Sequence, residues 1–231
     1  MTESVTGAAA ATVWLADGRT VADEALAACF DWLNPDEKIR YAGFVRPERQ
    51  RQFLLGRVLL RLALSRLLAV SPAGIFLTER AGFAPRLHCT GPAPGFSLSH
   101  SGAWVACAIS ADCALGLDIE ILDATRDFGG LAGQAFSADE LVWFDAQPPA
   151  QRVAAFYQLW SRKEANFKLD SVTGASVNAC CVSIVDPALS IVLCSARSAA
   201  VVLVHDALTA LSTVTHNFIS TANPTNPASA V

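Results

Sequence analysis

The sequence predicts an α+β fold, because patterns typical of long helices and of buried strands occupy different stretches of the chain. Residues 47–69 carry leucine or valine at helical spacing with arginines on another face, and residues 152–169 have the length of a second long helix. Residues 96–110 and 115–121 are dominated by apolar side chains, as buried strands are. We therefore expect helices packed against sheets.

Length and composition limit the number of domains and the class of protein that the chain can form. The 231 residues suffice for one large domain or two small, tightly joined ones, with 52% hydrophobic and 16% charged residues. The mean hydropathy of +0.37 is high, but charged residues interrupt the apolar runs before any could span a bilayer. The first residues lack the basic region of a secretory signal, so we expect a cytoplasmic protein without membrane attachment.

The seven cysteines favour neither a disulfide framework nor a zinc site. Their number is odd, no Cys-x-x-Cys pair occurs, and most lie among apolar neighbours. We expect them to behave as small hydrophobic residues.

The N-terminal part predicts one strand followed by helices. Residues 13–15 form a first short strand, and residues 22–34 a helix that closes before Pro35. Pro35 and the acids after it are typical of a helix start, where the dipole favours negative charge. The amphipathic helix of residues 47–69 ends before a Ser-Pro pair.

The middle of the chain predicts strands separated by a turn-rich stretch. An apolar segment at residues 75–78 precedes residues 81–95, which contain three prolines. Residues 96–110 and 115–121 then read as neighbouring strands. A composition boundary near residues 110–114 separates an arginine-rich half from a carboxylate-bearing half.

The C-terminal part predicts helices, then strands, then a tail. Ser137 is a helix N-cap with Glu140 at the capping-box position. β-branched residues predict strands at 181–194 and 199–205. Residues 220–231 hold almost nothing to bury, so we expect them to be disordered.

Basic residues concentrate in one segment of this acidic chain. The net charge is −4, yet residues 38–66 hold eight of the 17 lysines and arginines and a single acid, Glu48. A local positive segment on an acidic protein favours a small polyanionic ligand over nucleic acid. The alternative is a solvated helix face. The residues concerned are Lys38, Arg40, Arg46, Arg49, Arg51, Arg57, Arg61 and Arg66.

Two acids, Asp118 and Glu120, interrupt an apolar strand. Alternate strand residues share a face, so their Cα atoms lie about 6.6 Å apart on one side while Ile119 points into the core. Burying both acids unpaired would be costly. A single Mg²⁺ ion with phosphate oxygens would compensate them; the alternative is a polar strand edge.

Two further clusters each have an ordinary structural explanation. Glu164 and Lys168 are four residues apart and share a helix face, as surface ion pairs do, while Lys163 points about 100° away. Ser99 and His100 lie in a polar run that leads into a strand, where such groups either hydrogen-bond locally or bind a phosphate. A serine hydrolase is not indicated, because no Gly-x-Ser-x-Gly motif occurs.

Taken together and in this order, the clusters resemble the 4'-phosphopantetheinyl transferase superfamily, in particular its larger, surfactin-synthetase-activator-like group. The similarity spans roughly residues 35–185. The motifs that carry it are Arg51-Gln-Phe-Leu-Leu-Gly-Arg-Val-Leu-Leu-Arg61, Ser97-Leu-Ser-His-Ser-Gly-Ala-Trp-Val105, Leu115-Gly-Leu-Asp-Ile-Glu120, Phe136-Ser-Ala-Asp-Glu140 and Phe156-Tyr-Gln-Leu-Trp-Ser-Arg-Lys-Glu-Ala-Asn-Phe-Lys168.

The resemblance implies an architecture and an activity. The architecture is a pseudo-dimer of two similar α+β halves, here residues 1–112 with the coenzyme A contacts and 113–219 with the acids and the catalytic helix. The activity is Mg²⁺-dependent transfer of phosphopantetheine from coenzyme A to a serine of an apo acyl or peptidyl carrier protein, which releases 3',5'-ADP. This is holo-[acyl-carrier-protein] synthase chemistry, as used in polyketide or nonribosomal peptide biosynthesis, and we expect a monomer.

The resemblance also assigns roles to individual residues. Asp118, Glu120 and Glu164 would hold Mg²⁺, and Glu164 would also accept the proton of the carrier serine. Lys168 would stabilise the phosphates with help from Lys163. The remaining coenzyme A contacts would come from Arg40, Arg80, Gly82, Ser99 and His100.

Two departures from the family pattern leave alternatives open. The family's Gly-Lys-Pro loop reads Gly82-Phe-Ala-Pro85 here and lacks the lysine, for which Arg80 or Arg86 would compensate, and the turn after Lys168 is altered at Gly174-Ala-Ser176. A non-catalytic module that binds coenzyme A or a carrier protein is therefore the alternative to a transferase. A Mg²⁺-dependent phosphohydrolase that uses the same acids is a third hypothesis.

Overall fold

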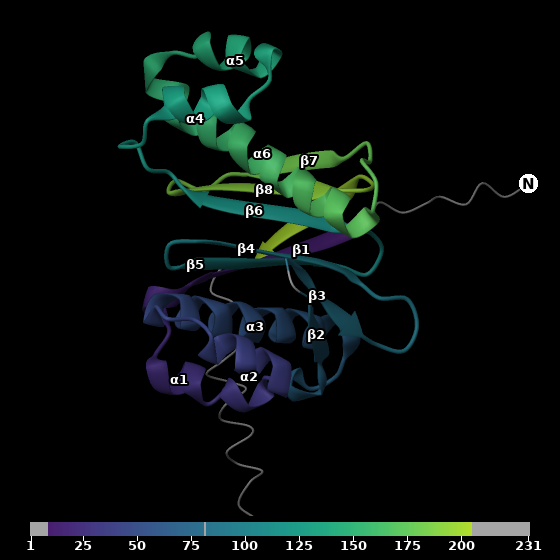
Figure 1. The fold of residues 1–231 in the computed structure, drawn as a ribbon. Coiled ribbons are helices and arrows are strands. Elements are labelled where there is room, and N and C mark those ends of the chain that lie inside the picture. The colour runs from purple at the N-terminus through teal and green to yellow at the C-terminus, as the bar shows by residue number, and fades with distance from the viewer. Residues whose placement is uncertain (1–8, 81, 205–231) are drawn as a thin grey trace, which may run out of the picture.

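The computed structural model describes residues 9–80 and 82–204, and within them the fold stacks four layers: helix, sheet, sheet, helix (Figure 1). The helices are α1 (Asp23–Ala27), α2 (Pro35–Ala42), α3 (Pro47–Leu68), α4 (Phe128–Ala135), α5 (Ala138–Asp145) and α6 (Arg152–Thr173). The strands are β1 (Ala9–Asp17), β2 (Phe76–Arg80), β3 (Phe83–His88), β4 (Gly95–Ser101), β5 (Trp104–Ser110), β6 (Leu115–Ile121), β7 (Cys180–Ile184), β8 (Leu189–Ser195) and β9 (Ala199–Val204).

The first sheet has the strand order β4-β5-β1-β9 and is covered on its outer face by α3. β1 pairs antiparallel with β5 and parallel with β9, so a strand from the C-terminal part of the chain completes the sheet of the N-terminal part. Alternate residues of β1 and β5, such as Trp14 and Cys107, pack against leucines of α3.

The second sheet has the order β6-β8-β7, and α6 lies across its outer face. Gly116 permits this close approach, because a Cβ at that position would come within 1.9 Å of the Ala165 carbonyl oxygen. Only glycine fits there without displacing the helix. The packing brings the middle of α6 directly over the strand that carries Asp118 and Glu120.

The two sheets face each other across an apolar core. Many inward side chains of β1 and β5 are alanine, at positions 9, 11, 106 and 108, next to Val13 and Leu15, while those of β6 and β8 are leucine and isoleucine. Ile119 is fully buried in this core, as the sequence predicted.

Several predicted elements are confirmed. α3 and α6 start within a residue of the predicted positions, and both are 22 residues long. Ser137 caps α5 and forms the predicted capping box with Glu140. Asn34, which was predicted to end a helix, instead caps α2 and forms a capping box with Glu37.

Other predictions were wrong in detail. Residues 96–110 are the hairpin β4–β5, which turns at Gly102 with a φ of 55°. Residues 181–194 are likewise the hairpin β7–β8. The turn-rich stretch 81–95 contains β3, paired with β2, and the helix predicted for 22–34 shortens to α1 and a 3₁₀ turn. α4 was not predicted.

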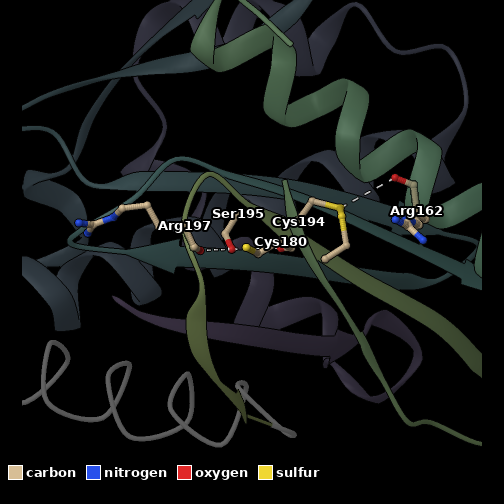
Figure 2. The surroundings of a disulfide bond; sticks show 6 residues. Arg162, Cys180, Cys194, Ser195 and Arg197 are labelled. Carbon is tan, nitrogen blue, oxygen red and sulfur yellow. Dashed lines mark hydrogen bonds between the residues drawn. A yellow bond between two sulfur atoms is a disulfide. The ribbon is translucent and has the colours of Figure 1, made fainter. Parts of the chain in front are cut away.

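Cys181 and Cys194 form a disulfide, which contradicts the expectation that the cysteines do not pair (Figure 2). They are direct partners across the β7–β8 ladder, with Cα atoms 4.1 Å apart. The Cys194 sulfur also lies 3.9 Å from the Arg162 carbonyl oxygen of α6, so the bridge is beneath that helix. The pairing comes from strand register, which cysteine spacing alone does not reveal.

Two further predictions concern membrane-spanning helices and the C-terminal tail. None of the helices in residues 9–80 and 82–204 combines the length and apolar character needed to cross a bilayer. The tail of residues 220–231 lies outside the described residues.

Candidate functional site

Serine side chains join the two sheets where β4 runs beside β6. The hydroxyl oxygens of Ser97, Ser99 and Ser101 accept hydrogen bonds from backbone N–H groups of residues 117, 119 and 121, at 2.9, 3.2 and 3.1 Å. The two strands are therefore linked through side chains rather than through a backbone ladder. We call these three contacts the serine seam; it places β4 alongside the acids of β6.

Asp118 lies at the centre of the seam and is held by two neighbours. Its Oδ1 accepts from Lys168 Nζ at 2.8 Å and from the Ser99 hydroxyl at 3.0 Å, while Lys168 also donates to the Leu117 carbonyl at 2.9 Å. Lys168 therefore turns inward to β6, and it makes no ion pair with Glu164. Asp118 is only 4% exposed, so its charge depends on this lysine.

The second oxygen of Asp118 has no partner. Asp118 Oδ2 is buried and unbonded within the described residues, an unusual state for a carboxylate oxygen because its desolvation is left uncompensated. A hard cation is the kind of ligand that would satisfy it. This oxygen is the observation by which the site fits a divalent metal.

Glu120 lies two residues further along the same strand. Its Oε2 accepts from the Ser101 hydroxyl at 2.7 Å. Burial raises the pKa of Glu120, and the negative charge of Asp118 raises it further, while Ser101, Arg126 and Lys168 oppose both effects. The charge of Asp118 thus disfavours the ionised form of Glu120, and a cation close to both carboxylates would relieve that repulsion.

Glu164, the predicted third acid, lies on α6 and is partly exposed, without a side-chain hydrogen bond to any described residue. Across residues 9–80 and 82–204, no three His, Cys, Asp or Glu side chains gather closely enough to share a metal ion. Asp118 and Glu120 thus form a two-acid pair in this conformation, and Glu164 stands apart from it.

A cavity of about 320 Å³ adjoins the Asp118 contacts. Five predicted site residues line it, drawn from α2, the β2–β3 turn, β4 and α6: Arg40, Gly82, Ser99, His100 and Lys168. Aromatic side chains, including Phe44 and Phe53, form much of the remaining wall. The cavity therefore combines positive charge with flat apolar surfaces, as a nucleotide site does.

One face of α3 supplies cavity residues to which the sequence analysis gave no individual role in the coenzyme A site. Arg49, Gln52, Phe53, Gly56 and Arg57 all line the cavity and follow helical spacing. That spacing was the signal available in the sequence. It was hidden by the leucine stripe on the opposite face, which dominates the hydrophobic pattern.

A chain of ion pairs runs from the core to this cavity. Buried Arg61 donates to Glu37 at 3.0 and 2.5 Å, and Arg57 lies 3.2 Å from Glu37. Arg57 also contacts Glu79 at 2.5 Å, and Glu79 in turn pairs with Arg40. Much of the predicted basic segment is therefore neutralised by acids from outside it, which leaves fewer free cations than composition indicated.

Two predicted site residues lie away from the cavity. Arg80 donates to the Ala84 carbonyl at 2.9 Å and covers the Phe83 ring, outside the cavity lining. Lys163 pairs with Glu140 of α5 at 2.7 Å. Phe83, in the place of the family's loop lysine, lines the cavity and is 58% exposed.

Comparisons with known proteins agree with this site. Residues 114–204, which contain both acids of β6 and all of α6, match the model of the 4'-phosphopantetheinyl transferase superfamily. The match agrees with the predicted family, and Asp118, Glu120, Glu164 and Lys168 all lie within the matched residues.

Curated relatives extend the match beyond that region. The chain is 36% identical over 121 residues to the 4'-phosphopantetheinyl transferase AcpT of Salmonella typhimurium, covering 52% of this chain and 58% of the relative. It is 35% identical over 129 residues to a 4'-phosphopantetheinyl transferase of Bacillus subtilis, covering 54% of each. For the transferase Sfp of Bacillus subtilis strain 168, identity is 33% over 152 residues, 59% of this chain and 64% of Sfp. The chain thus spans between half and two thirds of these relatives.

Proposed function

We propose that this protein transfers the 4'-phosphopantetheine group of coenzyme A to a serine of an apo acyl or peptidyl carrier protein. The observation that carries the proposal is the cavity lined by Arg40, His100 and Lys168, beside the unpartnered oxygen of Asp118. A polyanionic nucleotide matches the cations, and a carboxylate oxygen without a partner matches a metal. The superfamily match of residues 114–204 suggests the reaction class.

Mg²⁺ is the cofactor of the proposal. Asp118 and Glu120 would hold it, with Glu164 as the third acid. When bound, the ion would neutralise negative charge on the coenzyme A diphosphate as its P–O bond breaks. The fit rests on Asp118 Oδ2, whose burial without a partner is costly in the protein alone.

The chain's own residues would bind and orient the substrate. Lys168 meets Ser99 and Asp118 where both Lys168 and Ser99 line the cavity, so its positive charge would attract phosphate oxygens bound there. Arg40 and His100 would hold further phosphate groups. Fixed donors of this kind avoid the reorganisation that water would need as charge develops.

The bond changes follow from these positions. The serine oxygen of the carrier would bond to the phosphorus that bears the pantetheine arm, and the bond from that phosphorus to the leaving 3',5'-ADP would break. The serine proton would pass to Glu164, which is free of other side-chain hydrogen bonds among the described residues. Lys168 would lie close to the departing phosphate.

The proposal also covers the division of the chain into two halves, its oligomeric state and its location. Each half has a 22-residue helix across a sheet, α3 and α6, which supports a pseudo-dimer divided near residues 112 and 113, although β9 crosses that division. We further propose a cytoplasmic monomer that serves polyketide or nonribosomal peptide carriers and needs neither nucleic acid nor membrane.

The test is mass spectrometry of an apo carrier protein incubated with the full chain, coenzyme A and Mg²⁺. The expected result is a mass increase of one phosphopantetheine group, with release of 3',5'-ADP, that stops when EDTA removes the metal. Coenzyme A binding without modification of several carriers would contradict the transferase and favour the binding module. Release of free phosphopantetheine without a carrier would instead indicate a phosphohydrolase.

A further inference from the structure

The two sulfurs of the disulfide beneath α6 have different surroundings. Cys194 is fully buried, and its sulfur lies 3.9 Å from the Arg162 carbonyl oxygen of the helix (Figure 2). Cys181 is partly exposed and lines two cavities, of about 490 and 450 Å³, on the side of α6 that faces α5 and β7. A small thiol can therefore reach the Cys181 sulfur, whereas α6 shields Cys194.

The bridge belongs to a small apolar cluster that holds α6 against the β6-β8-β7 sheet. In this cluster Ala165 and Leu169 of α6 pack with Cys194, and Cys181 lies against them from β7. Ala165 directly follows Glu164 in the chain, and Leu169 directly follows Lys168. The packing around the sulfurs therefore positions the stretch of α6 that carries both residues of the proposed reaction.

β7 has few other attachments to the body of the protein. It is an edge strand, and β8 is its one hydrogen-bonded neighbour among the described strands. Three of its five residues are exposed, namely Cys180, Val182 and Ser183. A segment with few buried apolar contacts opens at low cost. The covalent link at Cys181 is therefore a main restraint that keeps β7 beside α6.

Reduction would change the contacts of both cysteines. Two thiols cannot stay at bonding distance, and because Cys194 is enclosed, the displacement would fall on Cys181 and β7. The new S–H group of Cys194 would face the Arg162 carbonyl, whose oxygen also takes part in the α-helix. Both changes act on the turn of α6 that contains Glu164.

We propose that Cys181 and Cys194 are a redox modification site, at which a dithiol reductant opens the bridge and slows phosphopantetheine transfer. The proposal rests on the proposed function, because transfer is the reaction that the bridge controls. Neither cysteine lines the cavity beside Asp118, so the bridge acts through α6 rather than on the substrate. In the cytoplasm proposed above, a disulfide generally serves catalysis or redox sensing, and this position favours sensing.

The exchange reaction has one accessible starting point. A thiolate of the reductant attacks Cys181 Sγ, the bond between the two protein sulfurs breaks, and Cys194 leaves as a thiolate that takes up a proton. The second thiol of the reductant then displaces Cys181 from the mixed disulfide. One dithiol is thereby oxidised to a disulfide, and the protein gains two electrons and two protons.

The first measurement needs no substrate. Hydrogen exchange of backbone amides is compared by mass spectrometry between the oxidised full-length protein and the same protein reduced with dithiothreitol. Reduction should speed exchange in residues 160–170 by about tenfold or more and leave α3 unchanged, because α3 covers the other sheet. Cys181→Ser should exchange like the reduced wild type in both conditions, whereas Cys180→Ser, which removes an exposed free thiol, should respond like the wild type.

The second measurement is the rate of carrier modification by the two redox states. The reduced wild type should be about tenfold slower or more at saturating substrates, since a small displacement of reacting groups is costly. Its calorimetric affinity for coenzyme A should change far less, because Arg40 and His100 lie on other elements. Oxidised dithiothreitol should restore the rate in the wild type and Cys180→Ser, but not in Cys181→Ser.

Equal hydrogen exchange in the two redox states, or equal transfer rates, would overturn the proposal. The wild-type comparison needs no substitution, so it decides the matter even if a variant fails to fold. Absence of transfer in both states would instead contradict the proposed function, and hydrogen exchange alone would then decide whether the bridge holds α6.

Discussion

Lys168 Nζ lies 2.8 Å from Asp118 Oδ1, and this contact ties the middle of α6 to the strand that carries both buried acids. The lysine compensates one oxygen of Asp118 and leaves the other, Oδ2, unbonded. A carboxylate that is charged, positioned and half-satisfied is prepared for one more cationic partner. Substitution of Asp118 tests whether this partner is a metal ion.

Asp118→Asn should abolish most transfer while leaving the protein folded. Asparagine keeps an oxygen that can accept from Ser99 and Lys168, but it removes the negative charge that a metal requires. Transfer should fall by about 100-fold or more, since metal stabilisation of the developing charge contributes several kcal/mol. The rate of carrier modification measures this, and circular dichroism checks the fold. Asp112→Asn, an exposed acid just before β6, is the control; equal rates in the two variants would remove Asp118 from the site.

Gly116→Ala should damage both stability and the site. The new methyl group would meet the Ala165 carbonyl, so α6 must move away from β6 and carry Lys168 with it. We expect a loss of about 3 kcal/mol in the free energy of unfolding, measured with urea. Gly133→Ala on α4 has no atom within 4 Å of its Cβ and should instead stabilise the protein by up to about 1 kcal/mol. Similar values for both would show that the α6–β6 contact is looser than described.

Glu37→Gln should destabilise the fold by disrupting buried ion pairs. Glu37 is fully buried and neutralises Arg61 and Arg57, so the amide leaves two buried guanidinium groups without a full counter-charge. A loss of about 3–5 kcal/mol in the free energy of unfolding is expected. Exposed Glu48→Gln should change it by less than about 0.5 kcal/mol. If chemical denaturation gives the two variants the same midpoint, the ion-pair chain does not support the core.

Cys181→Ser should remove the contribution of the disulfide. The bridge closes a loop with a sequence separation of 13 residues, for which chain entropy gives about 3 kcal/mol. Under oxidising conditions the variant should unfold at lower urea concentration than the wild type, and a reductant should bring the wild type down to the same level. Cys180→Ser, at the exposed neighbour, should match the wild type in both conditions. A reductant-insensitive wild type would mean that the bridge does not form.

The sequence analysis succeeded where local chemistry decides structure. Pro35 marked the start of α2 and Ser137 the start of α5, since the signals at a helix start act over three or four residues. Asp118 and Glu120 were found because acids in an apolar strand are costly and therefore visible. The resemblance to the transferase superfamily, which residues 114–204 match, was recognised from the order of such motifs.

The sequence analysis failed where the structure depends on contacts between residues that are far apart in the chain. Cys181 and Cys194 pair because two strands align in one register, and β9 joins β1 across almost the whole chain. Arg49 belongs to the cavity only because β4 brings His100 to the start of α3. None of these relationships leaves a pattern in a short window of sequence, because each depends on how separate elements pack.

At the serine seam, the length of the serine side chain sets the spacing between β4 and β6. A backbone ladder fixes the spacing between strands, whereas a hydroxyl bridge holds β4 and β6 apart by one additional carbon and oxygen. Ser99 and Ser101 spend their remaining hydrogen on Asp118 and Glu120, so the same groups that fasten the two layers also steer both acids. If one sheet slid past the other, the serine side chains would move the carboxylates of both acids. The packing of the two sheets therefore sets the positions of these carboxylates.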